Sequence, residues 1–368
     1  MTRLRIPDAF WEHARAVQQG RTAGRGRDAG PAAAVVEPAS VGWFRARAMH
    51  LTERLPDGAL AAGAAGGLQD TAPRAALVSL GARVGGVGPD GWEHPDLVQI
   101  WFRQADYVVP RADVGVFTRG AMPRDPGRAA ALEQAADAIA GMLAGEPRTT
   151  RTLTPAVPEV RGDHWVRLTA VTGRLHIRRD ARTVVVWAVD AGPGDDEAAR
   201  IELARRFLRW LGPADDRQFA RWAGVSRDDA AETWRRLGDE LVPVSVAGRA
   251  RSLLAADEPG LRGAAPGEGV RFLPMFDPWL YPDPAPIVPA PPPRVAGREP
   301  GPGISRRVLN SLAGRVLVDA AVVASWGRAG ARLTIAPWAG VDRARIGEEI
   351  DVLGATLGHA LTVRWLDP

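Results

Sequence analysis

The stretch ARRFLRWLGPADDRQFARWAGVSRDDAAETWRRLGDELVPVSVAGRARSLLA, residues 204–255, has the clearest secondary-structure pattern in the chain. Apolar residues at helical spacing predict one helix from about residue 197 to Leu211 and a second that ends before a turn at Gly224. Ser226 starts a third helix, with Asp229 three residues later as a capping pair. The remaining LVPVSVAGRARSLLA predicts a hairpin with a Gly–Arg turn. This order of helix, helix-turn-helix and hairpin predicts a winged helix.

The charges of the third helix argue against a direct role in reading DNA. From Ser226 to Glu240 the sequence carries three Arg and five Asp or Glu residues, which gives a net charge of −2. A helix with this balance repels phosphate. We therefore expect a structural role for it, and we expect any DNA-binding surface to lie on another face.

Helices and hairpins are also predicted elsewhere in the chain. Residues 56–58 start a helix that Gly66 and Gly67 end, and a second helix runs from about residue 72 to 84. The other predicted elements are two strands at 97–110, a helix at 127–144, two strands at 166–190, strands within 316–338, a helix at 341–357 and a last strand at 360–365.

These elements predict an α+β fold, with tandem winged-helix units followed by a β-rich C-terminal domain. Residues 20–38 are rich in Gly, Ala and Arg and lack periodicity, which is typical of a flexible segment. The predicted organisation is a flexible basic N-terminal extension at 1–40, winged-helix-like units at 41–125, 126–195 and 196–265, and a β-rich domain at 266–368 with a Pro-rich loop at 282–303.

Composition excludes several kinds of site. The 368-residue chain has no cysteine and six scattered histidines, so disulfides, thiol nucleophiles and Cys-ligated zinc are excluded, and no metal or other cofactor is expected. All 47 basic residues are arginine, and the net charge is +4. This permits nucleic-acid binding but also fits the codon bias of a GC-rich genome. The charged N-terminal sequence and the short apolar runs predict a cytoplasmic protein without a membrane span.

Four segments together resemble a known family. They are GGLQDTAPR (66–74), WFRQADYVVPRAD (101–113), ARRFLRWLGPADDRQFARWAGVS (204–226) and VRFLPMFDPWLYPD (270–283). Their order and character, from about Val41 to the C-terminus, resemble the AlkZ/YcaQ-type winged-helix DNA glycosylases. The resemblance implies tandem winged helices and a β-rich part around duplex DNA. It also implies an enzyme that excises N-alkylated purines, including bulky or crosslinked adducts, by hydrolysing the N-glycosidic bond.

The family's catalytic motif implies a site at residues 69–71. That motif is Gln, an aliphatic residue, then Gln or Asp, so Gln69 matches it while Asp70 and Thr71 depart from it. The family's hairpin often carries Arg and, four residues later, His; the corresponding residues are Arg103 and Tyr107, the second a departure.

The chemistry of base excision suggests roles for these side chains. An N7-alkylated purine is already cationic, so the enzyme mainly stabilises the sugar cation and positions a water. Gln69 can hold that water, Asp70 can oppose the positive charge, and Thr71 can hold water but is a poor base. Neighbouring residues in an extended segment point to opposite sides, so Gln69 and Asp70 need not share a site.

A structural role is the alternative for several of these residues. Asp70 or Thr71 can cap the helix that follows; we expect Thr71 to be the cap and Gln69 to face the DNA. We expect DNA contacts from Arg74, Arg103, Tyr107 and Arg111, although an exposed strand arginine and a half-buried tyrosine would explain Arg103 and Tyr107 equally well.

Two functions therefore remain open from the sequence. The first is a DNA glycosylase for alkylated purines, and the second is a non-catalytic DNA-binding or regulatory protein on the same scaffold. Both imply double-stranded DNA as the partner, and we expect a monomer.

Overall fold

The computed structural model describes residues 4–21, 33–157, 162–179, 183–191, 194–280, 313–338 and 341–366. The main helices are α1 (Asp8–Arg21), α2 (Pro38–Ala48), α3 (Leu60–Gly63), α4 (Ala75–Arg83), α5 (Val114–Thr118), α6 (Pro126–Leu143), α7 (Thr150–Leu153), α8 (His164–Thr169), α9 (Asp196–Leu211), α10 (Asp216–Ala223), α11 (Arg227–Leu237), α12 (Glu258–Arg262) and α14 (Arg343–Leu357). The strands are β1 (Ala34–Val36), β2 (Leu68–Gln69), β3 (Leu97–Phe102), β4 (Ala105–Pro110), β5 (Arg148–Thr149), β6 (Leu175–Arg179), β7 (Val184–Ala188), β8 (Leu241–Val246), β9 (Arg249–Leu254), β10 (Val270–Leu273), β11 (Gly314–Val318), β12 (Ala321–Ala329), β13 (Arg332–Pro337) and β14 (Thr362–Trp365).

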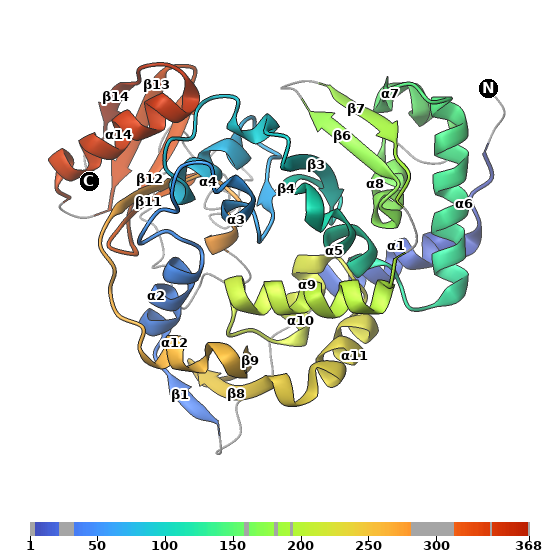
Figure 1. Ribbon diagram of the computed structural model, residues 1–368, viewed down its shortest axis with the longest axis horizontal. Helices are drawn as coiled ribbons and strands as arrows, with labels where there is room; N and C mark the ends of the chain where they lie inside the picture. The colour runs from blue at the N-terminus through green and yellow to red at the C-terminus, as the bar shows by residue number, and fades with distance from the viewer. Residues whose placement is uncertain are drawn as a thin grey trace, which may run out of the picture.

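Three sheets organise these elements (Figure 1). Their strand orders are β2-β4-β3-β6-β7-β5, β1-β8-β9 and β10-β11-β12-β13-β14. Helices and sheets are therefore mixed, as the α+β expectation requires. In the part of the chain that the structure describes, every helix is too short or too polar to cross a bilayer.

The six-stranded sheet joins two of the predicted units. Strands β2, β4 and β3 come from the segment 41–125, and β6, β7 and β5 come from 126–195. The two groups meet where Gln99 of β3 pairs with Ile177 of β6. The apolar alternation of 97–110 correctly predicts both strands of the β3–β4 hairpin, and all of β3 is buried.

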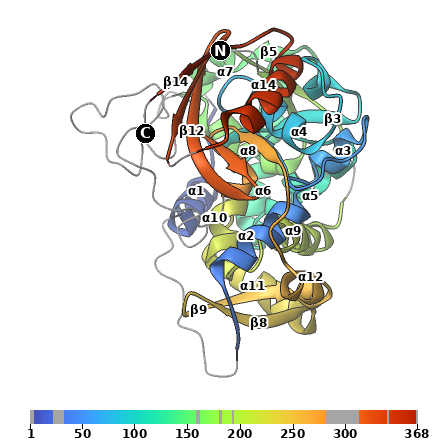
Figure 2. The same ribbon diagram turned by 90° about the vertical axis from the view of Figure 1, so that its left-hand side faces the viewer.

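Residues 197–255 have the predicted order of elements. Helices α9, α10 and α11 are followed by the antiparallel pair β8 and β9. The predicted cap is confirmed, because the Ser226 hydroxyl accepts a hydrogen bond from the backbone N–H of Asp229 at 3.0 Å. Figure 2 shows β8, β9 and α12 at one end of the molecule and α14 at the other.

The N-terminal extension expected to be flexible is largely structured, which corrects the prediction for 1–40. Helix α1 buries Phe10, His13 and Val17 and packs against α6 and α10. The spacing of these three residues is helical, so the signal was present in the sequence. Strand β1 pairs in parallel with β8, and Val41 and Phe44 of α2 are buried. Residues 22–32 of the expected extension lie outside the described residues.

Two helices predicted near the candidate motif are shorter than expected. The helix expected from residues 56–58 to Gly66 is the four-residue α3, and the next one starts at Ala75 rather than at residue 72. Trp210 packs directly onto Gly66 after α3: a Cβ there would lie 2.0 Å from the indole ring, so the position requires glycine.

The C-terminal part forms a sheet with one long helix, and its elements lie close to the strands expected within 316–338, the helix expected at 341–357 and the strand expected at 360–365. Strands β11, β12 and β13 are antiparallel, while β14 pairs in parallel with β13. Helix α14 packs against β10 and α4, and this contact joins the C-terminal sheet to the helix that follows the candidate motif. The predicted Pro-rich loop at 282–303 lies outside the described residues.

Candidate functional site

Gln69 lies on the outermost strand of the six-stranded sheet. Strand β2 pairs antiparallel with β4, which places Gln69 opposite Tyr107. The preceding Gly67 has a φ of +74°, and a Cβ on it would lie 2.9 Å from the ring of Phe117. A side chain at Gly67 would therefore be strained in backbone conformation and crowded by the ring, so the turn into β2 depends on glycine.

The Gln69 carboxamide is held at both ends. The Tyr107 hydroxyl donates to Gln69 Oε1 at 3.1 Å, and Gln69 Nε2 donates to Thr71 Oγ1 at 2.9 Å. Gln69 is 7% exposed and Tyr107 is 3% exposed, whereas Thr71 is half-buried. These contacts bring together three of the residues expected in or near the site.

Asp70 lies on the opposite face of the strand and caps helix α4. Its Oδ1 accepts from the backbone N–H of Ala76 at 3.0 Å, and its Oδ2 accepts from Gln99 Nε2 at 2.7 Å. The expectation that Thr71 is the cap is therefore wrong: Thr71 binds Gln69, and the longer reach of Asp70 satisfies the first turn of the helix. Burial raises the pKa of Asp70 to about 6.

Sequence reasoning missed a buried polar cluster behind Asp70. Gln99 Oε1 accepts from the backbone N–H of Arg179 at 2.6 Å. Asp106 accepts from Trp101 Nε1 at 2.9 Å and pairs with the Arg179 guanidinium, while its backbone oxygen accepts from the N–H of Asp70 at 2.7 Å. A signal was available, since Gln99 and Asp106 are polar residues inside apolar strands and buried polar groups need partners.

The predicted DNA-binding arginines do not form one cluster. The guanidinium of Arg74 stacks on Trp92, 4.1 Å from the ring centroid, and makes no hydrogen bond or ion pair within the described ranges. Arg111 instead donates to the backbone oxygens of Pro95 at 2.7 Å and Leu97 at 3.0 Å, so it holds the start of β3.

Arg103 lies in the turn of the β3–β4 hairpin, at the end of the hairpin away from Arg111. Its backbone oxygen accepts from the Arg21 guanidinium of α1, and that of Gln104 accepts from Arg167 at 3.1 Å. A Cβ on Gly224 would lie 3.0 Å from the Cβ of Arg103, so the turn packs against the end of α10. The hairpin tip is thus held by three other elements.

Comparison with known proteins identifies the family. The family model described as DNA glycosylase AlkZ-like matches residues 62–356, a range that includes all the site residues described above except Arg21. The chain belongs to the AlkZ-like DNA glycosylase family. Among solved structures it is similar to the Streptomyces sahachiroi DNA glycosylase AlkZ, with 18% identity, a TM-score of 0.67, and coverage of 90% of this chain and 100% of that chain. That likeness shows a shared fold. No curated protein matches the chain.

This member of the AlkZ-like family pairs two arginines of α11, Arg235 and Arg236, with carboxylates. Glu232 pairs with Arg235 and Arg236 on the same helix, and Arg236 also approaches Glu197 at 3.6 Å. Asp229 accepts the Ser226 hydroxyl at 2.8 Å. Arg235 and Arg236 thus already have carboxylate partners, which agrees with the structural role expected for this helix.

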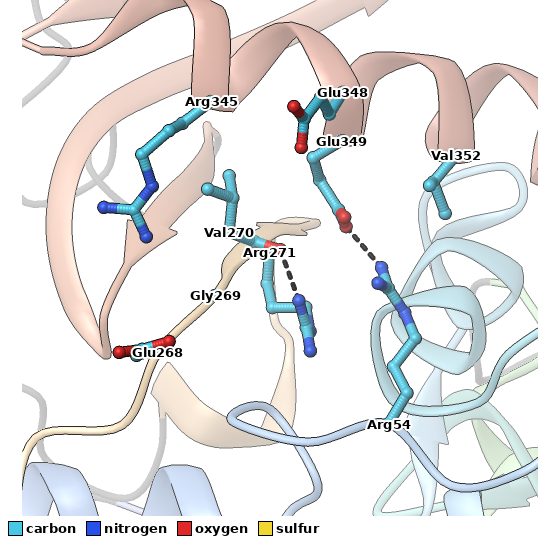
Figure 3. A pocket seen from close by; sticks show the side chains of 9 residues that line it. All are labelled: Arg54, Glu268, Gly269, Val270, Arg271, Arg345, Glu348, Glu349 and Val352. Carbon is cyan, nitrogen blue, oxygen red and sulfur yellow. Dashed lines mark hydrogen bonds and ion pairs between the residues drawn. The ribbon is translucent and has the colours of Figure 1, made fainter.

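A pocket of about 450 Å³ lies apart from the Gln69 cluster, between β10 and α14 (Figure 3). Arginine and glutamate side chains both line this pocket. Arg54 pairs with Glu349, and Arg271 donates to the backbone oxygen of Val270 at 2.7 Å. None of the expected site residues lines this pocket. Among the described residues, no group of three or more His, Asp or Glu side chains is arranged to hold a metal ion.

Proposed function

We propose that this protein is a DNA glycosylase that excises N-alkylated purines, including bulky or crosslinked adducts, from duplex DNA. The observation that carries this proposal is the Gln69 carboxamide, fixed between Tyr107 and Thr71 at the family's motif position. A carboxamide held in one orientation can contribute to transition-state stabilisation without reorganising during the reaction. Membership of the AlkZ-like family supports the same reaction class.

The proposed reaction is hydrolysis of the bond between the sugar C1′ and the purine nitrogen. The electron pair of this bond leaves with the base and neutralises its positive charge. A water oxygen forms the new bond to C1′, and its proton passes to solvent. The protein's task is therefore to place this water and the sugar, and the Gln69 cluster would supply the positioning groups.

The scaffold proposed for this activity is a set of tandem winged-helix units at 41–125, 126–195 and 196–265, with the β-rich domain at 266–368. The order α9, α10, α11, β8 and β9 supports a winged helix in the third unit. Strand β1 would then belong to this unit through its pairing with β8. We further propose that the protein acts as a monomer in the cytoplasm, where double-stranded DNA is its partner.

Single-turnover release of N7-methylguanine from duplex DNA tests the function. We expect release by the wild type and a rate about 10²–10³ lower in Gln69→Ala, which is typical for loss of one positioned transition-state contact. Gln134→Ala, an exposed glutamine of α6, is the matched control and should retain the wild-type rate. Equal rates in wild type and Gln69→Ala would remove Gln69 from the mechanism.

A second candidate is a non-catalytic DNA-binding or regulatory protein on the same scaffold. The position of Asp70 favours it, because this buried carboxylate is directed at Ala76 and Gln99 rather than at the Thr71 side of the strand. Duplex binding without base release, from N7-methylguanine or crosslinked substrates, is the result that would select this alternative.

A further inference from the structure

The hydrogen bonds around Gln69 run in one direction. Tyr107 donates to the Gln69 oxygen, and the Gln69 nitrogen donates to the Thr71 hydroxyl oxygen. Within the described residues, the hydrogen of the Thr71 hydroxyl has no protein acceptor. Each hydrogen bond therefore points outward, from Tyr107 through Gln69 to Thr71.

Burial follows the same direction. Tyr107 and Gln69 are 3% and 7% exposed, and only Thr71 reaches the half-buried range. Thr71 also begins the short connection to α4, in which Pro73 is exposed and Arg74 has its guanidinium on Trp92. Of the side chains of Tyr107, Gln69 and Thr71, that of Thr71 is therefore the most accessible to a macromolecule.

We propose that Tyr107, Gln69 and Thr71 form a hydrogen-bond relay in which the Thr71 hydroxyl is the group that donates to an acceptor oxygen at the DNA lesion. Tyr107 is a positioning residue that acts through Gln69 and Thr71. Gln69 orients the Thr71 hydroxyl in addition to its proposed contact with the attacking water. The contact to DNA rests on the proposed function, whereas the relay itself rests on the two hydrogen bonds. Tyr107 thus orients Gln69 through its hydroxyl, and this role replaces the direct DNA contact expected for it.

The relay gives a physical account of the departures from the family motif. Thr71 is too short to reach far into a DNA channel, but a hydroxyl that accepts from Gln69 has its hydrogen directed away from that partner. Tyr107 replaces an imidazole by a phenol whose hydroxyl reaches Gln69 at 3.1 Å. Chains of hydrogen bonds polarise one another, so each deletion weakens the terminal donor.

Side-chain amide NMR tests the relay without any substrate. The chain has seven Gln and one Asn, so its NMR spectrum contains few side-chain amide signals. The two NH₂ signals of Gln69 are identified as the pair that disappears in Gln69→Ala. We expect Tyr107→Phe and Thr71→Val each to shift this pair and to speed its hydrogen exchange. Thr334→Val, at a half-buried threonine of β13, is the matched control and should leave it unchanged. If the Gln69 NH₂ signals keep their position and exchange rate in both Tyr107→Phe and Thr71→Val, the relay does not exist.

Single-turnover kinetics at saturating enzyme test the role of the hydroxyl. We expect Thr71→Val to slow base release about tenfold, the size of one lost hydrogen bond, and Thr71→Ser to stay within about threefold of wild type. The rate of base release by Tyr107→Phe should lie between those of Thr71→Val and Thr71→Ser. Equal rates in wild type and Thr71→Val would overturn the assignment of Thr71 while the proposed function stands. An inactive wild type would overturn the proposed function and the DNA contact, while the NMR result still decides the relay.

Discussion

Asp70 carries a buried carboxyl whose protonation should affect folding. Its pKa is raised from 3.8 to about 6 by burial. A group with a raised folded pKa contributes stability that is present below the unfolded value and is lost as pH rises through the folded value. At about 1.4 kcal/mol per unit, the wild type should lose about 2 kcal/mol relative to Asp70→Asn between pH 4 and 7. Urea unfolding of both proteins across this range measures the difference.

The exposed Asp90 provides the control for this residue-scale prediction. Because its side chain is exposed, Asp90→Asn should change the free energy of unfolding only slightly. A difference between wild type and Asp70→Asn that stays constant from pH 4 to 7 would show that burial of the Asp70 carboxyl does not penalise its charged form.

Helix α1 is the element that most depends on close packing. In its last turn, a Cβ on Gly20 would lie 2.4 Å from the backbone oxygen of Val225, so α1 can approach the turn between α10 and α11 only with glycine there. We expect Gly20→Ala to destabilise the protein by about 1–3 kcal/mol through overpacking. At Gly141 in α6, an added Cβ would have no tertiary neighbour within 4 Å. We therefore expect Gly141→Ala to stabilise the protein by up to about 1 kcal/mol.

Paired unfolding curves of these two variants separate packing from helix propensity. Both substitutions have the same intrinsic effect on an isolated helix, so their opposite signs must come from the tertiary contact. Stabilisation by Gly20→Ala would mean that α1 is not docked against Val225 in solution.

At the scale of the whole molecule, DNA binding should depend on a few arginines outside α11. Each phosphate contact contributes a slope of about −0.9 to log K against log salt. We expect Arg74→Gly to weaken duplex binding and to reduce the slope by about one contact, because its guanidinium is stacked but not ion-paired in the described chain. Its φ of +64° suits glycine, so the backbone should tolerate this change.

Arg235→Ala is the comparison for that prediction. Arg235 already pairs with Glu232, so its loss should leave the affinity and the salt slope unchanged. Titrations of a fluorescent duplex at several salt concentrations measure both variants. Loss of binding in Arg235→Ala would instead assign the DNA contact to α11.

Local patterns determined many elements of this fold. Alternation in LVQIWF specified β3, helical spacing specified α6 and α14, and Ser226 specified the start of α11. The same reasoning placed Gln69 in the site through its motif. Each of these features depends on residues close together in the sequence, where side-chain period and capping chemistry act directly.

The tertiary structure alone decided which side chains meet. Strand alternation put Gln69 and Asp70 on opposite faces, but only the pairing of β2 with β4 brought Tyr107 to Gln69, 38 positions away along the chain. The pairing of β3 and β6 likewise joined Gln99 to Arg179. Such contacts depend on strand register and on packing between distant segments, which no local periodicity encodes. The sequence by itself therefore determined the elements and the motif, and the long-range pairing determined the candidate site.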